Sequence, residues 1–389
     1  MSFDSSKHIS KIVASIPPSG IRKFFDIAAE RPDAISLSIG EPDFVTPELF
    51  RSAAIRSLNE GKTAYTSNAG LAELRQAVAQ YTGAYFGVEY DYKKEIIITV
   101  GGSEAVDISL RSLLNPGDEI LIPEPCYVSY KPCAQMAGAK VITVPTYIEN
   151  DFKLSVEDLE KYVTPNTKVL LMSYPSNPTG AIMDRETLEE VAKFAVKHDL
   201  VIVSDEIYAE LTYDAEHCSI AAMPDMRERT VLISGVSKAF AMTGWRIGYV
   251  CAPVEIARAI AKVHQYVIMC APTISQYAAL EGVLHGYEEV MKMTAEYKKR
   301  KEYIIPRFRE MGLPMSEPHG AFYAFPSIKH TGMSSEEFCM RLLDEENVAV
   351  VPGNAFGDCG EGFFRCSYAT SMERLEKALD RMERFLKRI

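Results

Sequence analysis

The sequence lacks the features that mark several large classes of protein. Its apolar runs fall short of the roughly 18 residues of a membrane-spanning helix, and its N-terminus has no basic segment followed by an apolar run. We therefore expect neither a membrane span nor a signal peptide. Internal repeats and low-complexity tracts are missing, and the 23 glycines and 21 prolines are scattered without a period. These absences exclude collagen-like and coiled-coil proteins.

Positive charge and metal-binding spacings are also scarce. The chain has 42 Lys and Arg against 53 Asp and Glu, a net charge of −11, which makes it a poor candidate for binding nucleic acid or an anionic membrane. The eight cysteines form no C-x-x-C pair, and the seven histidines form no H-E-x-x-H motif. We expect no metal, and we expect the reduced, mostly structural thiols of a cytoplasmic protein.

What remains is the composition of a globular protein, with 47% hydrophobic and 24% charged residues over 389 positions. This length suggests two or three domains, or one large α/β domain with a smaller one. The middle of the chain alternates apolar, β-branched runs with helical patterns such as 184–198, where Asp184 is a candidate N-cap. Nearly continuous apolar runs are typical of parallel strands buried on both faces, so we predict an α/β sheet with helices on both faces. The expected strands are 95–100, 119–122, 140–144, 167–172, 200–204, 230–233 and 246–251.

The C-terminal third has a different pattern. It is helical from about residue 281 and through 298–312, and a last helix is expected to open at Thr370, which has the capping-box spacing to Glu373. This mixture predicts a smaller α+β domain, and residues 1–15 resemble an irregular arm. The short strands expected in this domain are 320–325, 348–351 and 362–367.

One lysine lies in a chemically suggestive position. Lys238 closely follows the expected strand 230–233 and lies in a turn of small residues. A lysine among apolar neighbours loses solvation, which lowers its pKa and makes its amine nucleophilic, as Schiff-base chemistry requires. Considered by itself, a loop lysine is more often a solvated surface charge.

The residues around Lys238 favour the chemical interpretation. The pattern S-x-x-S-K-x-F-x-M-x-G-x-R-x-G-Y over 234–249 resembles the cofactor-lysine motif of class I/II aminotransferases, pyridoxal-phosphate enzymes of the aspartate aminotransferase fold. The resemblance extends from the G-E-P-D-F segment at Gly40 to the R-C-S-Y segment at Arg365. It is strongest to the bacterial branch that holds aromatic and N-acetyl-diaminopimelate aminotransferases.

The resemblance implies a fold and an assembly. The expected fold is the α/β architecture of fold-type I pyridoxal-phosphate (PLP) transferases. A large cofactor-binding domain with a mostly parallel seven-stranded sheet is expected over 51–281. A small α+β domain is expected over 16–50 and 282–389. Tyr65 matches a tyrosine that reaches the phosphate in the neighbouring subunit, which implies a homodimer with shared active sites.

Several matching residues are expected around the cofactor ring. Asp205, at the end of a buried strand, corresponds to the carboxylate that pairs with the pyridine nitrogen and keeps it protonated. Tyr208 and Asn177 correspond to the donors to the ring's phenolic oxygen. Tyr127 corresponds to the aromatic residue that stacks on the ring. The resemblance also implies cis peptide bonds at Asn177–Pro178 and Glu124–Pro125.

Other matching residues are expected at the two anionic groups. The amides of Gly102 and Ser103, which open a helix, are expected to bind the cofactor phosphate together with Arg246 and Ser237. Their spacing is not that of a Walker A loop. Arg365 corresponds to the arginine that binds the substrate α-carboxylate, with Gly40 and Asn177 beside it.

The implied activity is transfer of an amino group between an L-amino acid of glutamate, aspartate or aromatic type and a 2-oxo acid. The cycle is ping-pong, with Lys238 moving the proton as base and acid, and Asp205 and Tyr208 supporting the chemistry at the ring. A β C–S lyase on the same scaffold is the alternative, because the same residues support elimination. A pyridoxal-sensing regulator would need an added DNA-binding domain, for which the segment before Gly40 leaves no room.

Specificity is less well defined by the sequence. We find no arginine in 264–275, where the best-known aspartate enzymes carry one for the distal carboxylate. Arg111 falls near a position where some bacterial relatives place a basic residue for acidic substrates, but a solvated helix arginine is the preferred interpretation. Phe322 and Ile21 would suit a bulky or aromatic substrate, and a purely structural role in the core is equally compatible with them.

Overall fold

A computed structural model describes residues 3–21, 24, 30, 31 and 33–389. Its centre is a seven-stranded sheet of order β2-β8-β7-β6-β5-β3-β4. All neighbouring pairs are parallel except those of β8, which is antiparallel to both of its neighbours. The strands are β2 (Ile96–Thr99), β3 (Glu119–Glu124), β4 (Lys140–Pro145), β5 (Thr167–Ser173), β6 (Val201–Asp205), β7 (Thr230–Gly235) and β8 (Gly248–Cys251).

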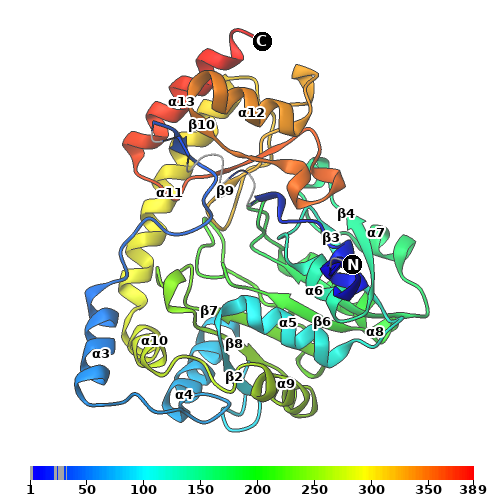
Figure 1. Ribbon diagram of the computed structural model, residues 1–389, viewed down its shortest axis with the longest axis vertical. Coiled ribbons are helices and arrows are strands. Elements are labelled where there is room, and N and C mark those ends of the chain that lie inside the picture. Colours follow the sequence, from blue (N-terminus) through cyan, green and yellow to red (C-terminus); the bar gives the residue numbers. More distant parts are fainter. Residues whose placement is uncertain (1–2, 22–23, 25–29, 32) are drawn as a thin grey trace.

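Helices cover both faces of this sheet (Figure 1). Alternate strand residues are buried against α5 (Gly101–Leu113), α6 (Tyr130–Met136) and α9 (Val254–Val267) on one face. Because successive side chains on a strand point to opposite sides, the other residues are buried on the second face. There they pack against five helices and form two hydrophobic clusters. These helices are α3 (Glu48–Asn59), α4 (Ala72–Tyr81), α7 (Val156–Tyr162), α8 (Arg185–Lys197) and α10 (Thr273–His285).

A second group of elements forms the upper part of the molecule in Figure 1. The short strands β11, β12 and β9 make an antiparallel sheet in that order, and β1 pairs in parallel with β10. Their shared core includes Phe322, Phe338, Phe364 and Phe385. The elements are β1 (Ile35–Ser36), β9 (Tyr323–Ala324), β10 (Val348–Ala349), β11 (Val351–Pro352), β12 (Phe364–Ser367), α11 (Tyr287–Glu310), α12 (Ser335–Glu346) and α13 (Met372–Leu386).

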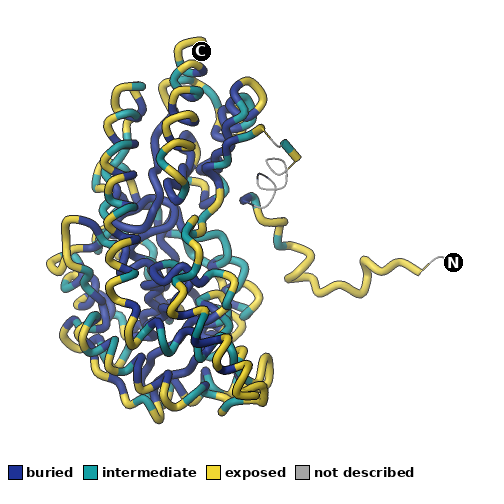
Figure 2. The backbone as a smooth tube through the Cα atoms, turned by 90° about the vertical axis from the view of Figure 1, so that its left-hand side faces the viewer, coloured by how far each residue is buried: buried dark blue, intermediate teal, exposed yellow. Residues whose placement is uncertain are grey.

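Single-turn elements complete the described chain. At the N-terminus, residues 3–19 are mostly exposed and project from the side of the molecule (Figure 2). They contain η1 (Ser5–His8) and α1 (Lys11–Ser15), so the segment expected as an arm over 1–15 is not wholly irregular, and residues 1–2 lie outside the described residues. The others are η2 (Thr82–Phe86), η3 (Ile148–Asn150), η4 (Ile220–Ala222), η5 (Arg227–Arg229), η6 (Thr243–Trp245), η7 (Lys329–Thr331), η8 (Gly353–Phe356) and η9 (Asp358–Gly360).

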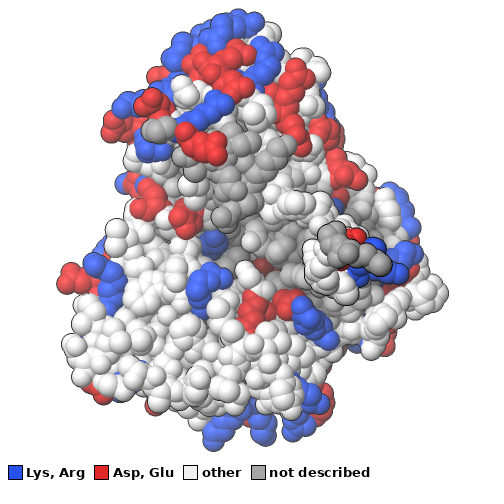
Figure 3. Space-filling view, viewed as in Figure 1, with Lys and Arg blue, Asp and Glu red and all other residues white. Residues whose placement is uncertain are grey.

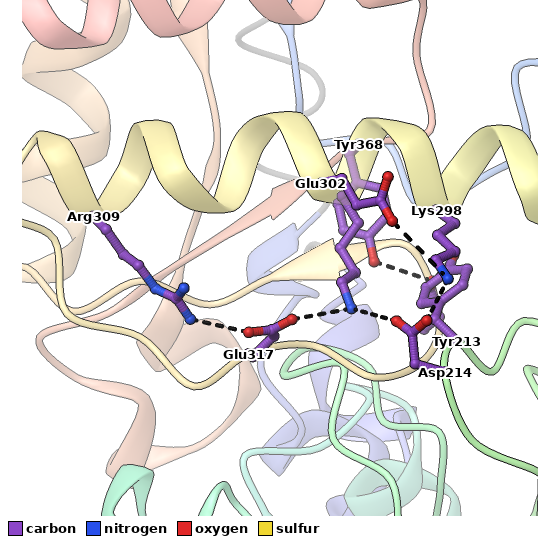
Figure 4. Close-up of polar contacts among 9 residues, drawn as sticks. Tyr213, Asp214, Lys298, Glu302, Arg309, Glu317 and Tyr368 are labelled. Atoms are coloured by element: carbon purple, nitrogen blue, oxygen red, sulfur yellow. Dashed lines mark hydrogen bonds and ion pairs between the residues drawn. The ribbon is translucent and has the colours of Figure 1, made fainter.

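The long helix α11 joins the two parts through charged contacts (Figure 4). Lys301 is buried, and its Nζ lies 3.4 Å from Asp214 Oδ2 and 3.2 Å from Glu317 Oε1. Lys298 also pairs with Asp214, and Arg309 pairs with Glu317 at 3.1 Å. A buried ammonium needs such counter-charges, so the loops that carry Asp214 and Glu317 are held against one face of the helix.

The sequence predicts most strands well and some boundaries poorly. The seven strands of the large sheet are confirmed, although β8 begins two residues late because Arg246 has a left-handed φ of 56°. The expected strand 348–351 is two strands in different sheets, and 320–325 shrinks to two residues. Ser371 caps α13 by accepting from the Arg374 amide, so the prediction that Thr370 opens this helix is wrong. Asp184 caps α8 as expected.

Glycine is required where β8 passes the start of α5. A Cβ on Gly248 would lie 2.6 Å from the carbonyl carbon of Gly101 and 2.7 Å from the amide nitrogen of Gly102. Real Cβ atoms do not approach backbone atoms this closely, so the start of α5 would have to move.

We expect the substitution Gly248→Ala to destabilise the fold by roughly 1–3 kcal/mol, as overpacking does in a rigid core. Urea unfolding followed by circular dichroism measures this as a lower midpoint. Gly244→Ala is the matched control, since its Cβ would meet nothing within 4 Å. Equal midpoints for the two variants would contradict the packing argument.

Candidate active site

A pocket of about 410 Å³ lies at the carboxyl ends of β5, β6 and β7, and Tyr323 and Arg365 from the upper part of the molecule also line it. Every site residue predicted from the sequence lines it, with one exception. Tyr65 does not line this pocket and is 81% exposed. The predicted residues brought together are Gly40, Gly102, Ser103, Tyr127, Asn177, Asp205, Tyr208, Ser237, Lys238, Arg246 and Arg365.

Asp205 ends β6 and points its carboxyl group into the floor of the pocket. Tyr130 donates a hydrogen bond of 2.7 Å to its Oδ2, and the Ile207 amide donates one of 3.2 Å to its Oδ1. Burial is the main cause that raises the pKa of Asp205 to about 6. A carboxylate that is this desolvated is stabilised by a nearby cation, so the site favours a positively charged ligand group here.

Lys238 lies in the turn that follows β7. Its Nζ donates a 2.7 Å hydrogen bond to the carbonyl oxygen of Gly40. Burial lowers the pKa of Lys238 to about 8, and the positive charges of Arg365 and Arg246 act in the same direction. The neutral, nucleophilic amine is therefore accessible near neutral pH.

An anion-binding cradle forms where α5 begins. Gly101 starts this helix with a φ of 72°, and the free amides of Gly102 and Ser103 follow in its first turn. Arg246 lies against the same turn, because a Cβ on Gly101 would lie 2.7 Å from Arg246 Nη2. A helix start with a guanidinium beside it suits a phosphate.

Behind this cradle, Glu104 holds the loop in shape. Its carboxylate accepts hydrogen bonds of 2.5 Å from the Val100 amide and 2.6 Å from Nδ1 of the buried His264. The cradle is thus fixed from within the protein before any ligand binds.

Arg365, on β12, lies on the opposite wall of the pocket. It is 2% exposed, its Nη1 donates to Asn177 Oδ1 at 2.9 Å, and its Nη2 donates to the Ser38 carbonyl at 2.5 Å. Its buried Nε has no hydrogen-bond partner in the described part of the chain. Burial lowers the pKa of this guanidinium. A buried cation with an unsatisfied donor suits a carboxylate ligand. Because Asn177 uses its oxygen to accept from Arg365, its amide hydrogens remain for a second acceptor.

Two tyrosines meet beside this arginine. The hydroxyls of Tyr208 and Tyr323 lie 2.8 Å apart, and both residues line the pocket. The guanidinium of Arg365 lies 4.6 Å from the centre of the Tyr323 ring. Tyr127 also lines the pocket, with its ring edge-to-face against Tyr130.

Sequence reasoning missed three residues of this network. They are Tyr130, which donates to Asp205, Tyr323, and Ser38, whose backbone accepts from Arg365. A signal existed for Tyr130 alone, since it follows Tyr127 by three residues and both lie near the end of β3. Tyr323 reaches the site through the pairing of β9 with β12, which no local pattern encodes.

The candidate specificity residues fall in different places. Ile21 lines the pocket. Phe322 does not: it is fully buried behind Tyr208, so its interpretation as a core residue is the correct one. Arg111 lies outside the pocket and donates to Asp107 at 2.8 Å on the surface of α5, as expected for a solvated helix arginine. The expected cis bonds at Asn177–Pro178 and Glu124–Pro125 are present, together with one at Tyr174–Pro175.

A large parallel sheet carrying a desolvated lysine and aspartate, with an anion cradle and a buried arginine, defines the PLP-dependent transferases of fold-type I. The chain belongs to the class I and II aminotransferase family, whose model matches residues 32–382. It is an aminotransferase, and its cofactor is pyridoxal 5′-phosphate. The family and fold implied by the sequence are thereby confirmed.

Known proteins resemble the chain over nearly its full length. An aspartate aminotransferase of Pyrococcus abyssi is 48% identical and covers 96% of each chain. Aromatic-amino-acid aminotransferase 2 of Thermococcus litoralis is 47% identical, covering 97% of this chain and 98% of its own. The structure of aspartate aminotransferase from Thermus thermophilus with maleate superposes with a TM-score of 0.93 at 39% identity, covering 97% of this chain and 99% of its own. These relatives favour the aminotransferase over the C–S lyase.

The residues present fit pyridoxal phosphate. The cradle at Gly101 suits its phosphate, and the buried Asp205 suits its protonated ring nitrogen. Lys238, with its lowered pKa, suits its aldehyde. The free amide hydrogens of Asn177 and the hydroxyl of Tyr208 suit its phenolic oxygen. Each group of the cofactor therefore meets a residue of matching charge or hydrogen-bonding capacity.

We expect Lys238 of the apoprotein to react with carbonyl reagents with a midpoint near pH 8, because its pKa is lowered to about 8. A solvated lysine would show a midpoint of about 10.4. The measurement is the pH dependence of reductive labelling by an aldehyde with borohydride, read at Lys238 by peptide mass spectrometry. Other labelled lysines in the same digest are the internal control. A midpoint at Lys238 equal to theirs would contradict the desolvation argument.

Proposed function

We propose that Lys238, Asp205 and Tyr208 are the catalytic residues of this aminotransferase. The observation that carries the proposal is the convergence of the desolvated lysine, the buried aspartate and the buried arginine on one pocket. When bound, pyridoxal phosphate withdraws electrons from the Cα of an amino acid substrate. The neutral amine of Lys238 then removes the proton from that Cα and later returns a proton, acting as base and acid.

The other pocket residues would bind and orient the reacting groups. Asp205 holds a proton on the ring nitrogen, because its desolvated carboxylate favours a cation beside it. Tyr208 and Asn177 donate to the phenolic oxygen, and Tyr127 packs on the ring. The phosphate would be held by Gly102, Ser103, Ser237 and Arg246 of this chain, with Tyr65 from the neighbouring subunit.

The substrate α-carboxylate would bind Arg365. The guanidinium is held by hydrogen bonds to Asn177 and to the Ser38 carbonyl. Its Nε has no hydrogen-bond partner among the described residues, so it can donate to a bound carboxylate. Gly40 lies at the same wall of the pocket. A rigid, dry arginine binds a planar carboxylate through two points and so fixes Cα near Lys238.

The proposed substrates are L-amino acids of glutamate, aspartate or aromatic type with 2-oxo acid acceptors, in a ping-pong cycle. The names of the aspartate and aromatic relatives support this range. In the pocket, Ile21, Tyr127 and Val128 offer apolar surface to a side chain. Apart from Lys238, Arg246 and Arg365, the described lining residues include no lysine or arginine for a distal carboxylate, which favours the aromatic class.

The test is the visible spectrum of the purified holoenzyme before and after addition of L-glutamate alone. We expect the visible band of the lysine-bound cofactor to shift to that of the amine form, and to return on addition of a 2-oxo acid. A panel of aromatic and acidic donors then ranks specificity by kcat/KM.

Lys238→Ala is the control for this spectrum, since it removes the amine that moves the proton and should abolish the interconversion. A band in the wild type that survives every amino donor would contradict the proposed half-reaction. Ammonia and pyruvate released from a thioether substrate would favour elimination instead.

We further propose a homodimer with shared active sites. Large exposed apolar residues lie in the loop after α3 and at the end of α9 and just beyond it: Tyr65, Tyr266, Val267, Ile268 and Met269. Figure 3 has a broad area with few charged side chains between α3 and α9. Exposed apolar surface of this kind is typical of an interface between copies. Tyr65 lies outside its own pocket, as a residue that serves the partner's site would.

We expect hybrid dimers of Tyr65→Ala and Lys238→Ala subunits to regain one intact site, because one site would combine Lys238 of the first subunit with Tyr65 of the second. Two different affinity tags isolate the hybrid, and light scattering checks its mass against the 43.3 kDa of one chain. The measurement is cofactor bound and turnover per hybrid. The two parent homodimers are the controls. If Tyr65 served its own subunit, both sites of the hybrid would be defective.

Two further proposals concern location and domain division. All eight cysteines are free, which supports a reducing, cytoplasmic compartment. None of the described helices is long and apolar enough to cross a membrane. The separate sheets and cores support a division into an arm over 1–15, a small domain over 16–50 plus 282–389, and a large domain over 51–281.

A further inference from the structure

Tyr323 is a pocket residue whose place is fixed from two sides. It begins β9 and is fully buried. Ala321, two residues earlier, pairs with the segment after Tyr208, since its amide donates to the Leu211 carbonyl at 2.8 Å. The Tyr213 amide likewise donates to the His319 carbonyl at 2.7 Å. The positions of Tyr323 and Tyr208 relative to each other are therefore set by the backbone.

The hydroxyl of Tyr323 faces Tyr208 at 2.8 Å. Its ring lies against the guanidinium of Arg365, with 4.6 Å to the ring centre. Its hydroxyl also packs on Gly40, because a Cβ on that glycine would lie 2.5 Å from it. Tyr323 thus contacts three residues to which the proposed function gives separate roles.

The hydrogen bond between the two hydroxyls can use only one proton. Burial raises the pKa of Tyr208 and also that of Tyr323, so both hydroxyls keep their protons near neutral pH. Each hydroxyl has one hydrogen to donate. If Tyr208 donated to Tyr323, it would have no proton left for the phenolic oxygen of the cofactor. Its proposed role therefore requires the opposite direction.

We propose that Tyr323 is a positioning residue that donates its proton to the hydroxyl oxygen of Tyr208 and thereby directs the Tyr208 proton to the phenolic oxygen of the cofactor. This inference rests on the role proposed for Tyr208. Hydrogen bonds in a chain polarise one another, so donation from Tyr323 strengthens donation by Tyr208. The stabilised phenolic oxyanion then holds the proton on the neighbouring lysine-linked nitrogen less tightly.

The test is the pH titration of the visible absorption of the holoenzyme, which reports the apparent pKa of that nitrogen. Tyr323→Phe keeps the ring against Arg365 and removes only the hydroxyl. We expect it to raise the apparent pKa by roughly 0.3–1 unit. Tyr208→Phe should raise it further, and the double variant should match Tyr208→Phe alone, because Tyr323 acts through Tyr208.

Tyr213→Phe is the matched control. Tyr213 is buried like Tyr323, and its hydroxyl donates to the Ala321 carbonyl, but the residue does not line the pocket. We expect the apparent pKa of this variant to equal that of the wild type. A shift as large as that of Tyr323→Phe would mean that both substitutions act through general packing, and would overturn the inference.

The remaining outcomes distinguish failure of the role inferred for Tyr323 from failure of the role proposed for Tyr208. A shift in Tyr208→Phe without one in Tyr323→Phe overturns the role of Tyr323 alone. A double variant that exceeds Tyr208→Phe overturns the relay, because Tyr323 would then act directly on the cofactor. No shift in Tyr208→Phe overturns the donor role of Tyr208, and the inference with it.

Discussion

The removal of water from a few charged groups is the constraint on which the rest of this structure depends. Asp205, Lys238 and Arg365 all titrate away from their ordinary values, and burial is the first cause for each. In water, the lysine would be an inert ammonium, and the aspartate would hold a ring proton weakly. The fold imposes the cost of desolvation on the empty site, and that cost is what makes the site selective for a ligand of complementary charge.

The large sheet and the three-stranded sheet both carry these pocket residues, and backbone hydrogen bonds fix the position of one sheet relative to the other. The large sheet supplies Asp205 at the end of β6 and Lys238 after β7, whereas the small sheet supplies Tyr323 and Arg365 on β9 and β12. Pairing between 211–213 and 319–321 fixes one relative to the other, and Gly180 accepts from two amides of the same loop. Lys301 of α11 pairs with Asp214 and Glu317, which holds the two paired segments against this helix. Tyrosine and arginine placed by such a frame need little rearrangement when a ligand binds.

The sequence predicts the parts of the site that lie next to strong local patterns. Lys238 and Gly102 follow buried strands or open a helix, so their neighbourhood can be predicted from the strands themselves. The predictions fail where position depends on pairing between distant segments. Tyr323 reaches Tyr208 only through contacts 115 residues apart in sequence, and no periodicity encodes them. The single strand predicted over 348–351 is two strands in the structure, because β10 pairs with β1, whereas β11 pairs with β12.

The unsatisfied Nε of Arg365 and the desolvated carboxyl of Asp205 have a consequence for the life of the protein in a cell. A ligand that binds the folded state alone stabilises it in proportion to the logarithm of its concentration. In the proposed site the cofactor would relieve the buried charge of Asp205, so it would act on folding as well as on chemistry. The amount of enzyme that survives proteolysis would then be coupled to vitamin supply. A cell short of pyridoxal phosphate would lose folded protein along with turnover.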